Sequence, residues 1–258
     1  MPIAPEVWQT PRILYLFGQS GLLQELVQAT FFNRHQLRDL AEDGRRLAEV
    51  FAAEVTGLGH VPEEGACLLL ANHPGIDVAL VAMYQFAAGL KEARGREIVF
   101  PMAGELALWG DLAPGYLQTL LARFQALYPD NMIPVPTIKS RPGYRTGRAQ
   151  ATERARRALR TGRVVVLHPE AETEQGNVML PKRIYRHGAG GLAKEASQAG
   201  IVQLPLAMWT GPARKTIIRV GEPFWVDPAL TNPEAVIEVM GKVAALMPNE
   251  LRGPFAEP

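Results

Sequence analysis

The sequence has little cysteine, almost no net charge and no long hydrophobic run. A single cysteine, Cys67, in 258 residues excludes an intramolecular disulfide and fits a reducing compartment. The 27 basic and 26 acidic side chains give a formal net charge of +1, which argues against nucleic acid as the main partner. Glycine and proline interrupt the uncharged stretch 196–213, so it is not a spanning helix. The start of the chain does not show the pattern of a secretory signal peptide, so we expect none.

Several catalytic patterns are also missing. The chain has no Gly-x-Ser-x-Gly motif and no paired histidine and cysteine spacing of the kind that binds metals, so neither a serine hydrolase nor a metalloenzyme is indicated. The glycine cluster 188–191 lacks the surroundings of a nucleotide-phosphate loop. We therefore expect no metal and no bound cofactor.

The even charge balance hides an uneven distribution. Residues 139–163 carry nine basic side chains and one acidic one, Glu153, a charge of +8 that leaves 18 basic and 25 acidic groups, or −7, for the rest. The basic residues are Lys139, Arg141, Arg145, Arg148, Arg154, Arg156, Arg157, Arg160 and Arg163. Those on a helix either form a solvated face or contact an anion, such as a phosphate of a substrate or a membrane.

From residue 65 onward, the apolar pattern predicts an α/β fold with a mixed, mostly parallel sheet flanked by helices. Short apolar runs, typical of buried strands, alternate with segments of helical period. The predicted strands are 66–71, 98–102, 132–135, 164–167, 201–206 and 217–220. The predicted helices are 76–89, 104–127, 146–161 and 233–247, and one more begins near His187.

Two amphipathic segments before this pattern predict an N-terminal helical hairpin, 12–30 and 34–53. The first is very apolar, so the hairpin either packs on the core or provides a surface for a membrane or a substrate. We divide the chain into a helical extension, 1–53, and a domain, 54–258, that together form one compact unit.

The sharpest local feature is the sequence NHPGID at 72–77, which follows a buried strand and opens a helix. Open α/β sheets bind their ligands at such strand ends. If the helix begins by Pro74, His73 and Asp77 lie one turn apart on one face. A carboxylate on one ring nitrogen fixes the imidazole tautomer and leaves the other nitrogen to accept a proton. Alternatively, Asp77 only caps the helix and His73 bonds the local backbone.

Further short motifs accompany this one, in order, between residues 54 and 226. They read EVTGL at 54–58, VP at 61–62, LLLANHP at 68–74, MAGEL at 102–106, IPV at 133–135, VVVLHPE at 164–170, YRHGA at 185–189, VQLPL at 202–206 and GEP at 221–223. Each is weak alone. Their order and spacing resemble those of the PlsC-like glycerolipid acyltransferases, the family of 1-acyl-glycerol-3-phosphate and glycerol-3-phosphate acyltransferases.

The resemblance implies an O-acyltransferase that moves a fatty acyl group from an acyl-CoA or acyl-carrier-protein thioester to a hydroxyl of a lysolipid or related lipid acceptor. It implies His73 as general base, Asp77 as its partner, and 54–258 as the acyltransferase domain. A backbone N–H near Gly75 or Gly188 would stabilise the oxyanion. The implied substrate-binding residues are Asn72, Gly75, Glu170, Lys139, Arg141, Arg145, Arg183, Arg186 and Gly188. We expect a cytoplasmic protein, peripheral on the inner face of the membrane, with no nucleic-acid partner.

Three features depart from the family's pattern. Three residues rather than four separate His73 from Asp77, the third block lacks the glycine and arginine after Glu170, and Thr137 replaces an arginine of the second block. Because a planar guanidinium binds phosphate bidentately, the missing arginines leave open whether the acceptor carries a phosphate. They also leave an alternative function, a catalytically altered family member that binds lipid or acyl chains.

Other residues have competing interpretations. The His-x-x-x-Asp spacing also occurs in acyltransferases of the chloramphenicol acetyltransferase and plant BAHD type, but those have glycine after the Asp, where this chain has Val78. Glu170 either orients an acceptor hydroxyl or a basic side chain, or is only a capping residue at the protein surface. His168 is interpreted as a packing residue rather than a catalytic one, and His187 as either a helix cap or a ligand contact. Cys67, in mid-strand, should be inert.

Overall fold

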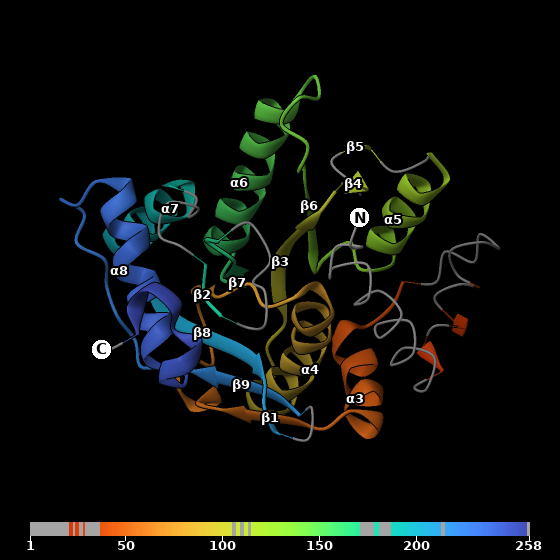
Figure 1. The fold of residues 1–258 in the computed structure, drawn as a ribbon, viewed down its shortest axis with the longest axis horizontal. Coiled ribbons are helices and arrows are strands. Elements are labelled where there is room, and N and C mark those ends of the chain that lie inside the picture. The colour runs from red at the N-terminus through yellow and green to blue at the C-terminus, as the bar shows by residue number, and fades with distance from the viewer. Residues whose placement is uncertain are drawn as a thin grey trace.

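A seven-stranded sheet forms the centre of the protein (Figure 1). The structure, a computed structural model, describes residues 37–104, 115–170, 187–212 and 215–256, with 21, 22, 24, 25, 28, 107, 108, 111, 112 and 178–180 besides. The strands of the sheet are β1 (Ala53–Thr56), β2 (Cys67–Ala71), β3 (Ile98–Ala103), β6 (Met132–Val135), β7 (Val164–Leu167), β8 (Val202–Thr210) and β9 (Thr216–Val220). Their order is β1-β9-β8-β2-β7-β3-β6.

Five neighbouring strands, from β8 to β6, run parallel, whereas β9 and β1 run in the opposite direction. The predicted α/β fold with a mixed, mostly parallel sheet is therefore confirmed. Because the five parallel strands all end at one edge of the sheet, the loops that follow them meet there. We call this edge the carboxyl edge, and the opposite edge the amino edge.

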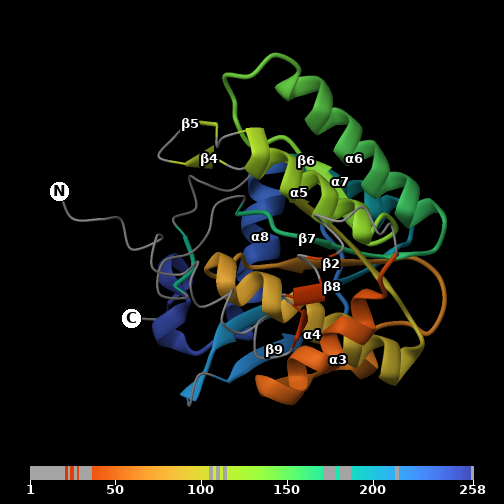
Figure 2. The ribbon, with the colours of Figure 1, turned by 90° about the vertical axis from the view of Figure 1, so that its right-hand side faces the viewer.

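Helices flank the sheet on both faces. They are α3 (Leu40–Val50), α4 (Ile76–Arg94), α5 (Gly115–Leu127), α6 (Tyr144–Arg160), α7 (His187–Gln198) and α8 (Asn232–Ala245), with the short 3-10 helices η2 (Leu58–His60), η5 (Asn249–Leu251) and η6 (Gly253–Phe255). Figure 2 shows α6 on one side of β2 and β8 and both α3 and α4 on the other. Within the described parts of the chain, no helix combines the length and the hydropathy needed to cross a membrane.

The central strand β2 contributes to two separate hydrophobic cores. Cys67, Leu69 and Ala71 join the core that contains side chains of α3 and α4, whereas Leu68 and Leu70 join the core under α6, α7 and α8. All five side chains are buried. Burial on both faces explains why the sequence of this strand is an unbroken apolar run rather than an alternation.

Two predicted helices differ from the observed elements. The helix expected at 104–127 is wrong in its first half, where β4 (Ala107–Leu108) and β5 (Asp111–Leu112) form an antiparallel pair before α5. Glycine and proline in this stretch disfavour a continuous helix. The helix expected at 34–53 begins only at Leu40, because the carboxylate of Asp39 accepts two backbone N–H groups and caps it.

Most of the first predicted helix, 12–30, lies outside the described residues, so its role at the core or at a membrane stays a prediction. The second helix of the expected hairpin, α3, packs against α4 of the domain. Its buried Asp43 accepts a hydrogen bond from the hydroxyl of Tyr128, just beyond α5, at 2.7 Å. The polar contact therefore links α3 to the segment between α5 and β6.

Gly44 sets the distance between α3 and α4. A Cβ atom placed on this residue would lie 1.9 Å from the carbonyl oxygen of Tyr84, far inside van der Waals contact. Only a glycine lets the two helices approach so closely. The buried positions on either side of this contact, Ala41 and Leu47, show that the close approach lies within the core.

We expect Gly44→Ala to lower the free energy of unfolding by about 1 to 3 kcal/mol, the usual cost of overpacking, although alanine is the better helix former. The matched control is Gly115→Ala in α5, where an added Cβ would meet no atom within 4 Å. Denaturant unfolding of both variants measures the difference. Equal stability of the two variants would contradict the close approach.

Candidate active site

Four polar residues gather at the carboxyl edge, where β2 and β7 end. Asn72 and His73 follow β2, and His168 and Glu170 follow β7. The two strands are parallel neighbours, with Leu70 of β2 facing Leu167 of β7. Residues almost a hundred positions apart in the sequence therefore meet, and the rings of the two histidines lie edge to face, with centroids 4.8 Å apart and an interplanar angle of 62°.

Asn72 fixes the chain at the end of β2. Its buried side-chain amide donates to the Met208 carbonyl oxygen and accepts from the Met208 N–H, both at 2.8 Å. Main-chain pairing of β2 with β8 ends one residue earlier, where Ala71 faces Leu206. The side-chain amide of Asn72 thus pairs with Met208 in the way that a further peptide group of β2 would. These two bonds give Asn72 a structural role at the strand end, and its expected role in substrate binding stays a prediction.

His73 lies between β2 and α4 rather than within the helix. The helix begins at Ile76, and its N-cap residue Gly75 has a non-helical backbone with ψ of 145°. The expected one-turn relation of His73 to Asp77 assumed a helix from Pro74, and this helix starts two residues later. The side chain of Asp77 lies outside the described part of the structure, so its role as orienting group stays a prediction.

The tautomer of His73 follows from its backbone contact. Its Nδ1 lies 3.2 Å from the carbonyl oxygen of Pro74. Because a carbonyl oxygen only accepts hydrogen bonds, Nδ1 carries the proton and Nε2 is the basic nitrogen. Burial lowers the pKa of His73 below its ordinary value of 6.5, against an opposing effect of the bond to Pro74. The imidazole is therefore neutral at pH 7.

Glu170 is fully buried and holds the backbone of His73. Its carboxylate accepts the N–H of His73 at 2.7 Å through one oxygen and the N–H of Leu180 at 3.0 Å through the other. The alternative that Glu170 caps the surface is wrong, because the side chain has no exposed area. Its role in orienting an acceptor hydroxyl or a basic side chain stays a prediction.

His168 contacts both residues at the end of β2. Its Nδ1 lies 2.7 Å from the carbonyl oxygen of Asn72, so this nitrogen also carries a proton. Burial, with a contribution from nearby His73, lowers the pKa of His168 to about 3. The residue remains neutral and packs, as the sequence suggested, but its packing partner is His73, a contact that sequence analysis did not identify.

A cavity of about 320 Å³ opens beside α6. It is lined by Gly104, Pro134, Pro136, Gly147, Gln150, Ala151 and Arg154. Gly104 follows β3 and Pro136 follows β6, so the cavity reaches the carboxyl edge. Neighbouring strands lie about 4.8 Å apart, which places these strand ends roughly 5 to 10 Å along the sheet from the end of β7.

Arg154 is the charged residue of this lining. It shares one helix face with Gly147, Gln150 and Ala151, a spacing in the sequence that could have identified it. Among the described residues, no acidic side chain pairs with Arg154. Later in α6, by contrast, Arg156 bonds Glu195 at 2.7 Å.

The other predicted substrate-binding residues are spread around this edge. Lys139 and Arg141 are exposed in the turn before α6, and Arg145 is exposed in its first turn. Gly188 is exposed in the first turn of α7. Arg183 and Arg186, together with the side chain of His187, lie outside the described residues, so their roles stay predictions.

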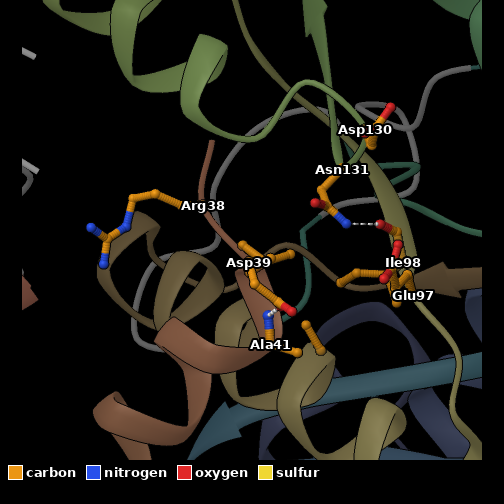
Figure 3. Close-up of a pocket in the computed structure, with 9 residues that line it drawn as sticks. Arg38, Asp39, Ala41, Glu97, Ile98, Asp130 and Asn131 are labelled. Carbon is orange, nitrogen blue, oxygen red and sulfur yellow. Dashed lines mark hydrogen bonds between the residues drawn. The ribbon is translucent and has the colours of Figure 1, made fainter. Parts of the chain in front are cut away.

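A second cavity, of about 170 Å³, lies at the amino edge (Figure 3). Its lining includes Ile98, where β3 begins, and Asn131, which precedes β6. Two of its polar groups form structural bonds: Asp39 caps α3, and Asn131 donates to the Ile98 carbonyl oxygen at 2.8 Å. This cavity is therefore separate from the histidine site at the opposite edge.

Comparisons with known proteins support a common fold but not a closer relationship. No family model matches the sequence, and no curated protein matches it. The structure is similar to the crystal structure of the 1-acyl-sn-glycerophosphate (LPA) acyltransferase, PlsC, from Thermotoga maritima, with a TM-score of 0.51. The match covers 92% of this chain and 97% of that one at 16% sequence identity. The chain therefore has the fold of this acyltransferase.

Proposed function

We propose that the protein is an O-acyltransferase that moves a fatty acyl group from a CoA or carrier-protein thioester to a hydroxyl of a lysolipid or lipid precursor. The observation that carries the proposal is the neutral imidazole of His73, whose Nδ1–H is engaged by the Pro74 carbonyl so that Nε2 can accept a proton. Its place at the carboxyl edge of a sheet with the fold of a PlsC acyltransferase supports this function, as does the order of the sequence motifs.

In the proposed reaction, Nε2 of His73 takes the proton of the acceptor hydroxyl while the oxygen attacks the thioester carbonyl carbon. A C–O bond forms and negative charge develops on the carbonyl oxygen. The C–S bond then breaks, and the departing thiolate takes the proton from the imidazolium. The hydroxyl proton thus ends on the thiol. A thiolate leaves readily, so no covalent acyl-enzyme is needed.

The first turn of α4 is the proposed site of oxyanion stabilisation. Its N-cap, Gly75, has no side chain that could cover the N–H groups of this turn. The N-terminus of a helix also carries a partial positive charge. An oxyanion that forms beside His73 would therefore meet donors fixed in place before the reaction.

The basic groups beside the 320 Å³ cavity are the proposed partners of the substrate's phosphate. Arg154 lines the cavity, and Lys139, Arg141 and Arg145 lie near the start of the same helix. They would attract a phosphate of CoA, of a carrier protein's prosthetic group or of the acceptor. Anionic lipid at the inner face of the membrane would add about 1 kcal/mol per nearby basic residue.

We expect His73→Gln to lower kcat by about 10²- to 10⁴-fold, the usual contribution of a general base. The matched control is His60→Gln, because His60 also has its Nδ1 3.2 Å from a backbone carbonyl oxygen but lies away from the carboxyl edge. The assay incubates labelled acyl-CoA with a panel of lysolipids and identifies products by mass spectrometry. Undiminished turnover by the His73 variant would exclude this mechanism.

The same assay distinguishes the alternative function. If wild-type protein binds acyl-CoA but gives no product with any acceptor in the panel, the protein is a lipid or acyl-chain binding protein. The replaced arginine at Thr137 and the altered sequence after Glu170 motivate this alternative.

The pH dependence of kcat/KM should follow His73. Because burial lowers its pKa, the basic form already predominates at neutral pH, and raising the pH further adds nothing. We expect a plateau at and above pH 7 and a fall toward acid with an inflection below 6.5, measured in buffers of constant ionic strength. An inflection above pH 7 would contradict His73 as the base in this buried setting.

We expect Arg154→Gln to raise KM for a phosphate-bearing substrate roughly three- to tenfold, equivalent to about 0.7 to 1.4 kcal/mol, with little change in kcat. Its matched control is Arg160→Gln, in the same helix, because Arg160 is already bonded to Glu153 at 3.0 Å. A thioester of N-acetylcysteamine, which lacks the phosphate, should show whether the donor or the acceptor is affected. Equal effects of the two variants would count against a phosphate site.

A further inference from the structure

His168 has contacts that the proposed reaction does not use. One side of its ring is fixed by the hydrogen bond from Nδ1 to the Asn72 carbonyl oxygen, at 2.7 Å. The ring then meets that of His73 edge to face, with 4.8 Å between centroids. The residue thus bonds the backbone immediately before His73 and packs against the His73 side chain itself.

These two contacts add to the hydrogen bonds that His73 makes itself. The carboxylate of Glu170 holds the His73 N–H, and the Pro74 carbonyl accepts from the ring at a long 3.2 Å. Hydrogen bonds of the ring to the backbone of His73 and Pro74 alone leave it some freedom to rotate. An aromatic neighbour in edge-to-face contact favours one orientation and also excludes water from that side.

We propose that His168 is a positioning residue for His73: the Asn72 carbonyl fixes the His168 ring, and this ring holds the His73 imidazole in the orientation in which Nδ1 bonds Pro74 and Nε2 is left for the substrate. The inference rests on the proposed function, in which Nε2 of His73 accepts the proton of the acceptor hydroxyl. It assigns His168 no proton transfer of its own.

A second catalytic base at this position is disfavoured by charge. During the reaction His73 becomes an imidazolium, and another imidazolium 4.8 Å away would repel it. His168 avoids this, because burial and the neighbouring histidine keep its pKa far below the working pH. A neutral ring beside His73 suits a base that is protonated only transiently.

The test uses the full-length protein with ¹⁵N-labelled histidine and two variants, His168→Ala and His168→Phe. Ring ¹⁵N chemical shifts give the tautomer and the titration of His73 directly, without any acyl transfer, and the His73→Gln variant assigns the signals. The alanine variant loses both the ring and its hydrogen bond. The phenylalanine variant retains an aromatic edge but loses the bond to Asn72.

We expect His168→Ala to admit water, shift the titration of His73 upward toward 6.5 and mix its two neutral tautomers. His168→Phe should lie between this variant and wild type. In the acyl-transfer assay, kcat should fall about tenfold or more in the alanine variant while KM changes less than about threefold, because positioning acts on the reacting complex. Partial recovery of kcat by phenylalanine would identify the ring contact as the cause.

The inference is overturned if the tautomer and titration of His73 in His168→Ala are those of wild type. It is equally overturned if a folded alanine variant raises KM alone. Thermal unfolding of each variant shows whether it is folded. If the alanine variant does not fold, the phenylalanine variant carries the same measurements. If the wild-type protein transfers no acyl group at all, the proposed function fails, whereas the NMR titration still decides whether His168 positions His73.

Discussion

The two hydrogen bonds between the Asn72 amide and the Met208 backbone are the contact on which the histidine site depends. A strand at the centre of a sheet cannot simply stop, because the backbone groups of its longer neighbour would be left buried and unpaired at a cost of about 1 to 3 kcal/mol each. Asn72 replaces the missing peptide group of β2 with its side chain. The main chain is thereby released from the sheet one residue before His73, and the carbonyl group of Asn72 becomes available to His168.

The other buried polar groups of the site also form hydrogen bonds with the main chain. The carboxylate of Glu170 would be costly to bury alone, but it accepts the N–H groups of His73 and Leu180. This arrangement joins the turn after β2 to the turn after β7. The His73 ring is therefore not needed to hold the backbone through both of its nitrogens. The packing that positions this ring also buries it, and the burial lowers its pKa.

The sequence predicted the fold well where local patterns are sufficient. The strands at 132–135 and 164–167 match their predicted bounds, because each is an apolar run bounded by polar or turn residues. The helix expected at 104–127 fails in its first half, where two short antiparallel strands, β4 and β5, replace it. The partners of site residues could not be predicted, because no periodicity encodes a contact such as that between Asn72 and Met208, 136 residues apart. The helix after His73 begins at Ile76 rather than Pro74 for a local reason, the non-helical backbone of Gly75.

The basic residues of the segment 139–163 have different surroundings at the two ends of α6. α6 runs from the carboxyl edge, where β6 ends, to the amino edge, where β7 begins, and acidic partners are concentrated toward its end. Glu195 and Glu153 bond Arg156 and Arg160 there, and Glu97 lies 3.6 Å from Arg163. Arg154, beside the cavity, has no acidic partner among the described residues. Pairing therefore offsets part of the excess charge at the amino edge. In the proposed function, the basic groups at the edge that holds His73 would draw an anionic substrate toward a neutral base.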